Sequence, residues 1–193
     1  MQKLKRYLWL SQINLFVWLI VCSFIASSVV FKNGGVSNYG NHYSTTPFFA
    51  IAFLGDSIYL YLASESLLIL DRKFKHLARY LNILCVLLLS VFVTTFPRRF
   101  GVIFTDIHDN ISIALFGYEL LLAFWLLFKR PTRETVGYGL IMLIGTIIGF
   151  MSALHILGLM FVGQMVGELG FALLLVFVLP KVVAQELKKT TRK

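Results

Sequence analysis

The sequence predicts an all-α membrane protein, a polytopic bundle of six transmembrane helices with both termini in the cytoplasm. The 193-residue chain is 58% hydrophobic and has a mean hydropathy of +0.80. Only 14% of its residues are charged, against roughly 25% in an average soluble domain. Its apolar residues form runs of about 20, the length that crosses a bilayer as a helix, and basic residues separate these runs.

The six predicted helices form a single transmembrane domain, 1–193, and span residues 8–31, 47–70, 77–96, 107–128, 135–154 and 163–184. The first run follows Lys3, Lys5 and Arg6, which resembles a secretory signal. It is longer than the usual signal core of about 7–15 residues. We therefore expect a retained first helix.

The breaks between the helices follow from residues that favour turns. Residues 32–46 are rich in glycine, asparagine and serine and predict a loop. Pro47 suits the first turn of the second helix, where its missing N–H would have no partner. Polar breaks follow at 71–76, 97–101 and 129–134, and an apolar turn at 155–162 joins the last two helices.

The distribution of basic residues predicts the orientation. Of the 18 lysines and arginines, only Lys32, Arg98 and Arg99 fall on one side of the predicted membrane. The other fifteen lie on the opposite side, in the N-terminal tail, two loops and the C-terminal end. Because cytoplasmic segments carry the excess of lysine and arginine, both termini are predicted to be cytoplasmic. Basic residues dispersed in this way do not form a nucleic-acid-binding patch.

Small residues recur on the last two predicted helices. Gly145, Gly149 and Ala153 are spaced by four, and Gly163 and Gly167 continue the pattern. Such spacing lets helix backbones approach closely in lipid. We expect these residues to pack the bundle internally; the alternative is an interface with a second copy of the chain or another membrane protein.

Five carboxylates lie inside the predicted helices. Glu65 is close enough to the cytoplasmic end to reach water and Asp109 lies at the start of its helix, so the other three are the more informative ones. Asp56 is nine residues beyond Pro47 and Glu119 eleven beyond His108, which places them about 14 and 16 Å below the outer face at 1.5 Å per residue. Glu168 lies closer to that face. An acidic side chain at the centre of a membrane helix costs on the order of 3 kcal/mol and usually faces the protein interior or a wet cavity. No lysine or arginine lies at this depth to pair with them.

Helical periodicity groups these residues. Eleven residues at 100° each return to within about 20° of the start, so His108 and Glu119 share a face, with Ser112 and Leu115 between them. The second helix is polar on several faces, which predicts that it occupies the centre of the bundle.

Three of the four histidines, His42, His108 and His155, fall at the outer face. If the fourth and fifth helices form an antiparallel hairpin, His108 and His155 are neighbours at its outer end. With Asp109 they would form a metal site, since imidazole and carboxylate suit zinc. The spacing matches no known zinc motif, and capping of the fourth helix is the alternative role for Asp109. No cofactor is predicted, and zinc is the one candidate metal.

Short motifs resemble a known group of proteins. They are Val36-Ser37-Asn38-Tyr39-Gly40, Phe96-Pro97, Ile107-His108, Ala114-Leu115-Phe116 and Gly167-Glu168. In this order they resemble the DRAM/FRAG/SFK-like six-helix membrane proteins and a related uncharacterised prokaryotic membrane family. The resemblance implies a role in lipid handling or membrane asymmetry, and carries over His108 and Glu168. Asn38 stands where the pattern usually has aspartate, which removes a charge from the outer loop.

These observations predict a non-enzymatic protein of the plasma membrane. An outward-facing polar pocket would bind a lipid headgroup or another small ligand, with membrane lipids as partners. His42, His108 and His155 would border it, with Asp56, Glu119 and Glu168 deeper. One alternative is an intramembrane metal-dependent hydrolase acting on lipid, although the sequence identifies no catalytic residue. Another is a small proton- or cation-coupled carrier, although paired glycine or proline interruptions are missing.

Overall fold

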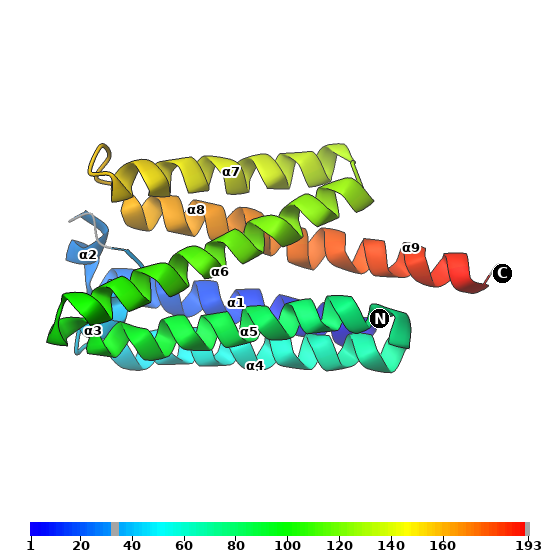
Figure 1. Ribbon diagram of the computed structural model, residues 1–193, viewed down its shortest axis with the longest axis horizontal. Coiled ribbons are helices and arrows are strands. Elements are labelled where there is room, and N and C mark those ends of the chain that lie inside the picture. Colours follow the sequence, from blue (N-terminus) through cyan, green and yellow to red (C-terminus); the bar gives the residue numbers. More distant parts are fainter. Residues whose placement is uncertain (32–34, 192–193) are drawn as a thin grey trace.

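The computed structural model describes residues 1–31 and 35–191, and all regular elements in these ranges are helices. Six helices are long and apolar enough to cross a membrane, so the predicted fold class is confirmed to that extent. The N and C termini lie at the same end of the bundle (Figure 1). The elements are α1 Gln2–Ile25, α2 Ser27–Phe31, α3 Asn38–Asn41, α4 Thr46–Leu70, η1 Arg72–Phe74, α5 Lys75–Thr95, η2 Phe96–Phe100, α6 Val102–Lys129, α7 Arg133–Ala153, α8 Met160–Leu173, η3 Leu174–Val178 and α9 Leu179–Thr191.

The helix boundaries differ from the predicted ones mainly at polar ends. α1 begins at Gln2 rather than residue 8 and ends at Ile25, where Ala26 leaves helical geometry. α6 begins at Val102 rather than residue 107, directly after Gly101, whose φ of 149° ends the preceding turn. Hydropathy locates the part of a helix that lies in lipid, whereas the hydrogen-bonded helix continues into the polar layers.

The predicted loop before α4 contains a short helix, α3. Residues 32–34 of that loop lie outside the described residues. Val36 N–H donates to Gln164 Oε1 of α8 at 2.7 Å, and the Tyr39 ring packs edge-on against Phe161. These contacts place the loop against the end of α8. Pro47 occupies the first turn of α4, as predicted.

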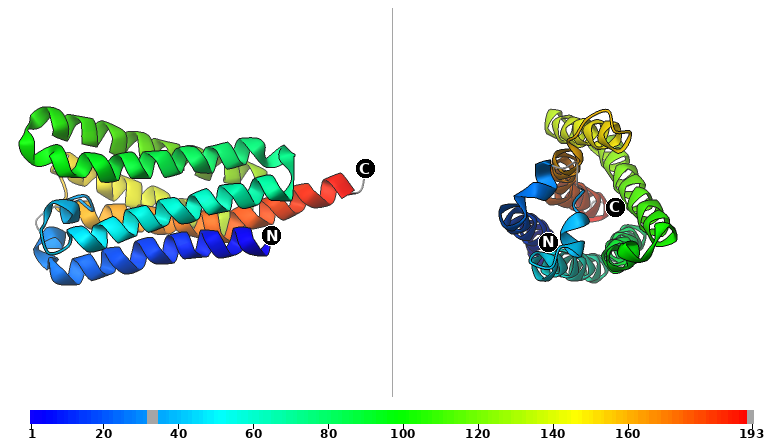
Figure 2. Two further views of the ribbon diagram at one scale, coloured as in Figure 1. Left: turned by 90° about the horizontal axis from the view of Figure 1, so that it is seen from below. Right: turned by 90° about the vertical axis from the view of Figure 1, so that its left-hand side faces the viewer.

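Neighbouring helices pack in chain order over most of the bundle. α1 packs on α4, α4 on α5, and α5 on α6, while α7 packs chiefly on α8. α6 crosses the bundle obliquely, so that it begins beside α5 and reaches α7 at its other end (Figure 1). Seen along the bundle axis, the helices surround a common centre (Figure 2). The side chains of their inward faces form the core.

The last transmembrane helix is the most buried one. This corrects the prediction that the second helix, α4, occupies the centre of the bundle. Of the most apolar stretch of the span Met160–Lys189, 67% is buried, against 39% for α4. This span comprises α8, a π-helical turn and α9. Pro180 has no N–H, and its ring displaces the carbonyl four residues back. The N–H of the preceding Leu179 accordingly donates to Leu174 O, five residues back, which is the π-helical pattern.

The glycines of α7 and α8 pack against each other inside the bundle, as predicted. A Cβ on Gly145 would lie 2.0 Å from Gly167 N, and one on Gly163 would lie 2.3 Å from Gly149 N. A Cβ on Gly170 would likewise lie 2.3 Å from Met142 N. Only glycine permits this backbone contact, which makes α7 and α8 a tightly joined hairpin.

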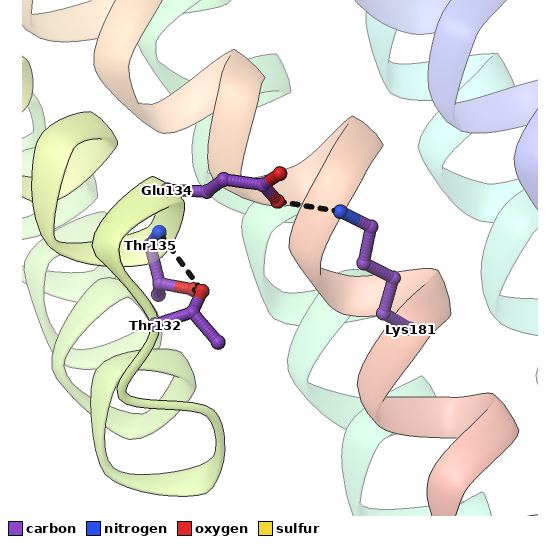
Figure 3. Close-up of polar contacts among 4 residues, drawn as sticks. All are labelled: Thr132, Glu134, Thr135 and Lys181. Carbon is purple, nitrogen blue, oxygen red and sulfur yellow. Dashed lines mark hydrogen bonds and ion pairs between the residues drawn. The ribbon is translucent and has the colours of Figure 1, made fainter.

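An ion pair joins the beginning of α7 to α9 (Figure 3). Lys181 Nζ donates to Glu134 Oε2 at 2.6 Å, and the Thr132 side chain caps α7 by accepting from Thr135 N at 3.3 Å. The two charged side chains are 41% and 58% exposed. Such an exposed pair contributes little to stability, so it orients the helices more than it stabilises them.

Candidate functional site

Asp56 of α4 is held at the interface with α1. It is 1% exposed, and Ser11 Oγ donates a hydrogen bond to its Oδ1. Gln12 Nε2 in turn donates to Ser11 Oγ at 3.0 Å. Two polar residues of α1 therefore orient one oxygen of a carboxyl group that is closed off from the surface.

The close approach of α1 and α4 depends on Gly55. A Cβ there would lie 2.5 Å from Asn14 Nδ2. The Asn14 amide occupies this space and donates to Ile51 O at 3.0 Å and to Ala52 O at 2.9 Å. This amide fixes the register of the two helices and brings Ser11 to the level of Asp56.

Glu119 of α6 and Glu168 of α8 complete a group of three carboxyl groups from three different helices. Glu119 is 3% exposed and Glu168 is partly buried. Glu119 interacts electrostatically with both Glu168 and Asp56, and Glu168 with Asp56. We call Asp56, Glu119 and Glu168 the carboxylate group. Its members converge from helices that lie far apart in the sequence.

No basic side chain neutralises the carboxylate group within the described ranges. The salt bridges there involve Asp71, Glu134 and Glu186 instead. Across residues 1–31 and 35–191, the carboxyl groups of Glu119 and Glu168 also form no hydrogen bond with the protein. Of the three acidic groups, only Asp56 therefore has a hydroxyl donor, which is Ser11.

His108 is buried on the inward face of α6, as its spacing from Glu119 predicts, with 2% of its surface exposed. Its Nδ1 lies 3.1 Å from Thr94 Oγ1 of α5, and its Nε2 lies 3.4 Å from Ser112 Oγ. Arg98 interacts with it electrostatically. His108 is therefore part of the α5–α6 interface, a full eleven residues along α6 from Glu119.

The three outer histidines do not share one environment. His42 is exposed after α3, and its Nδ1 lies 2.9 Å from Ser44 Oγ. His155 is exposed in the turn after α7, with a positive φ of 59°. The expected pairing of His108 with His155 assumed an antiparallel hairpin of α6 and α7. The oblique course of α6 instead places its beginning against α5.

The predicted zinc site receives no support from the geometry. Asp109 is exposed, whereas His108 is buried. Among the residues that the structure describes, no group of three or more histidine, cysteine, aspartate or glutamate side chains is placed to hold a metal ion. This also applies to Asp56, Glu119 and Glu168 of the carboxylate group.

Asn38 has a structural role in the outer loop. Arg98 Nη1 donates to Ser37 Oγ at 2.8 Å and to Asn38 Oδ1 at 3.4 Å. The loop therefore holds the guanidinium through neutral acceptors. Among the described residues no carboxylate forms a salt bridge with Arg98.

Sequence reasoning missed Ser11 and Gln12 as parts of the site. The signal was the occurrence of Ser11, Gln12 and Asn14 within four positions of an apolar run. Polar residues so far inside a membrane helix face other helices. Their partner on α4 is set by the register of two helices, which the sequence alone does not specify.

The contact between Ser11 and Asp56 leads to a testable expectation. We expect Ser11→Ala to lower the free energy of unfolding by about 1.5–3 kcal/mol, because it removes a buried hydrogen bond to an acidic group. Unfolding by increasing SDS, followed by circular dichroism, measures this change. Ser23→Ala is the matched control, since the Ser23 hydroxyl bonds only Ile20 O of its own helix. An equal decrease in the free energy of unfolding in Ser11→Ala and Ser23→Ala would contradict the assigned role of Ser11.

No protein-family model matches the chain, and no curated protein or solved structure shows significant similarity to it. The six candidate spans make it an integral membrane protein. The resemblance to the DRAM/FRAG/SFK-like proteins stays a prediction from the short motifs.

Proposed function

We propose that the protein binds a cationic group, a protonated amine, between Asp56, Glu119 and Glu168. The observation that supports this proposal is the convergence of three acidic side chains without a basic partner among the described residues. A buried acidic group is stabilised by an opposite charge or by hydrogen-bond donors. An ammonium group supplies both, since it carries a positive charge and up to three donors.

The spacing of the carboxylate group favours an organic cation over a metal ion. The three side chains are not placed around one ion, and divalent metals require oxygen ligands within about 2.6 Å. An alkylammonium group presents its N–H donors at hydrogen-bond distances of about 2.7–2.9 Å and in several directions. Two or three separated carboxyl groups can therefore contact it together.

The same chemistry occurs in a free amine and in the headgroup of an amine-bearing lipid. The site lies about halfway along α4 and α6. A free amine and a lipid headgroup must therefore each pass through the protein or the surrounding lipid to reach it. Binding of this kind requires no catalytic residue. The proposed activity is accordingly recognition of an amine inside the membrane.

A comparison of matched amphiphiles tests the proposal. Purified protein in neutral nanodiscs is titrated with dodecylamine and with dodecanol, and bound ligand is measured by native mass spectrometry. We expect dodecylamine to bind more tightly than dodecanol. Glu119→Gln and Glu168→Gln should each weaken dodecylamine binding about tenfold or more, because a hydrogen bond to a charged group contributes about 1.5–3 kcal/mol.

Glu65→Gln is the control variant. Glu65 lies on α4, nine residues beyond Asp56, about 14 Å along the helix. The Glu65→Gln substitution removes one acidic group from the same helix as Asp56 and should leave dodecylamine binding unchanged. Equal affinity for the amine and the alcohol, or unchanged binding in Glu119→Gln, would overturn the proposal.

A further inference from the structure

Basic side chains gather at the end of the bundle that holds both chain termini, where α6 ends and α7 begins (Figure 1). The beginning of α9 lies beside them, because Lys181 of α9 forms the ion pair with Glu134 of α7. We call Lys129, Arg130, Arg133 and Lys181 the basic corner. Four basic residues against one acidic residue, Glu134, leave an excess of three positive charges.

The acidic side chains near the basic corner already have partners. Glu134 accepts a hydrogen bond from Lys181 Nζ at 2.6 Å (Figure 3). It also interacts electrostatically with Arg130, but no salt bridge joins these two residues. Glu186 interacts electrostatically with Lys129 and forms its salt bridge with a lysine of its own helix. The positive charge of the corner is therefore only partly balanced by the described residues.

Arg130 is the member of the basic corner whose donors are least satisfied. It directly follows α6, and its side chain is only partly exposed. Among the described residues, its guanidinium forms no hydrogen bond and no salt bridge. Its Nε is closed off from the surface, whereas Nη1 and Nη2 are not. These two terminal nitrogens carry four of the five N–H donors, and they are accessible to an acceptor from outside the chain.

The chemistry of the basic corner suits a phosphate group. The planar guanidinium donates parallel hydrogen bonds to two oxygens of one phosphate, and this geometry is specific to arginine. Lys129 and Arg133 lie next to Arg130 in the sequence, are exposed, and form no salt bridge within residues 1–31 and 35–191. They can therefore add positive charge around the same anion. Basic residues between the ends of membrane helices bind lipid headgroups in this way.

The surroundings of the basic corner favour a lipid as the source of the phosphate. Phe124 and Phe128 in the last turns of α6 are 54% and 86% exposed, and Val136 in the first turn of α7 is 45% exposed. Trp125 lies under Lys129, whose Nζ is 5.9 Å from the ring centroid. Tryptophan is enriched at the level of the headgroups. The corner thus lies where apolar side chains suited to acyl chains meet basic ones suited to phosphates.

We propose that the basic corner binds the phosphate of an anionic phospholipid through the terminal nitrogens of Arg130. The positive excess favours a headgroup with a net negative charge over a zwitterionic one, whose own ammonium group is repelled. This site is separate from the carboxylate group, since Arg130 lies eleven residues along α6 from Glu119, about 16 Å. It binds an anion at the end of the bundle and does not depend on amine binding.

A comparison of two lipids tests the proposal. Purified protein in detergent is titrated with dioleoylphosphatidylglycerol and with dioleoylphosphatidylcholine, which share their acyl chains and differ in headgroup charge, and bound lipid is measured by native mass spectrometry. We expect phosphatidylglycerol to bind about tenfold more tightly or better. Equal affinity for the two lipids would refute the proposal. Displacement of phosphatidylglycerol by an equal concentration of inorganic phosphate would assign the corner to free phosphate and refute the lipid.

Substitutions at the basic corner locate the site. Arg130→Gln should weaken phosphatidylglycerol binding about tenfold, because it removes charge-assisted hydrogen bonds. Arg130→Lys keeps the charge without the planar fork and should restore only part of the affinity. Arg133→Gln changes an exposed residue and should weaken binding about threefold. It provides a second measurement if Arg130→Gln does not fold, which circular dichroism shows.

Lys75→Gln is the matched control. Lys75 is exposed at the start of α5, and the connection between α4 and α5 lies apart from that between α6 and α7 at the same end of the bundle (Figure 1). This variant should change phosphatidylglycerol affinity less than about twofold, because exposed charges more than about 10 Å apart are largely screened at 0.1 M salt. An equal decrease in Lys75→Gln and Arg130→Gln would indicate diffuse attraction and contradict a site at Arg130.

Discussion

Alanine at Gly145 is expected to destabilise the protein by about 1–3 kcal/mol, the usual range for an extra methyl group in a packed interior. The added Cβ would lie 2.0 Å from Gly167 N and 2.5 Å from its Cα. Both atoms belong to the backbone and cannot move aside as the end of a side chain can. The hairpin of α7 and α8 must therefore open by a large fraction of an ångström or more. SDS-induced unfolding followed by circular dichroism measures the loss.

Gly149→Ala is a close control for this experiment. It adds the same methyl group to the same helix four residues further on, where the nearest atoms lie at 3.9 Å, an ordinary van der Waals distance. We expect its stability to stay near that of the original protein. If Gly145→Ala instead kept its stability and only changed the oligomeric state in size-exclusion chromatography, the glycines would form an interface between chains.

Glu119→Gln is expected to raise the free energy of unfolding by about 1–3 kcal/mol while abolishing tight amine binding. An acidic side chain at the centre of a membrane helix costs on the order of 3 kcal/mol, and Glu119 has no hydrogen bond to another described residue that the substitution would break. The amide is nearly the same size as the carboxyl group, so the packing around position 119 is preserved. A binding site that carries an energetic strain of this kind becomes more stable when its function is removed.

This prediction separates a ligand site from a structural role. If Glu119 joined helices through a hydrogen bond, its removal would lower stability instead. Glu65→Gln again serves as the control, since Glu65 lies outside the carboxylate group. The same SDS titration, repeated with dodecylamine, should stabilise the original protein more than Glu119→Gln, because the gain in stability from a ligand falls as its affinity falls.

The sequence predicts the helices well because their signal is local. Runs of apolar residues indicate the membrane spans, and Pro47 indicates the start of α4. The glycine spacing indicates the contact of α7 with α8. Each of these signals lies within a few neighbouring residues and acts through backbone geometry or transfer into lipid. The candidate carboxylates could also be chosen from the sequence, because an acidic side chain without a basic partner is unfavourable at any position inside a membrane span.

The arrangement of the site was less predictable because it depends on tilt and register. The separation of His108 from the α7–α8 turn follows from the oblique course of α6, which no residue of α6 encodes by itself. The burial of the last helix depends on its packing against α1, α6 and α7, which lie far apart in the sequence. Similarly, Ser11 meets Asp56 because Asn14 fits at Gly55, a contact between positions about forty residues apart.

The glycine contact also determines where the bundle can part most easily. α7 and α8 meet backbone to backbone, whereas α1 meets the last helix mainly through its π-helical turn and leaves apolar space beside it. The α7–α8 hairpin thus behaves as one unit. A movement of the bundle would shift this hairpin as a whole against α1, while its glycine contacts stay closed.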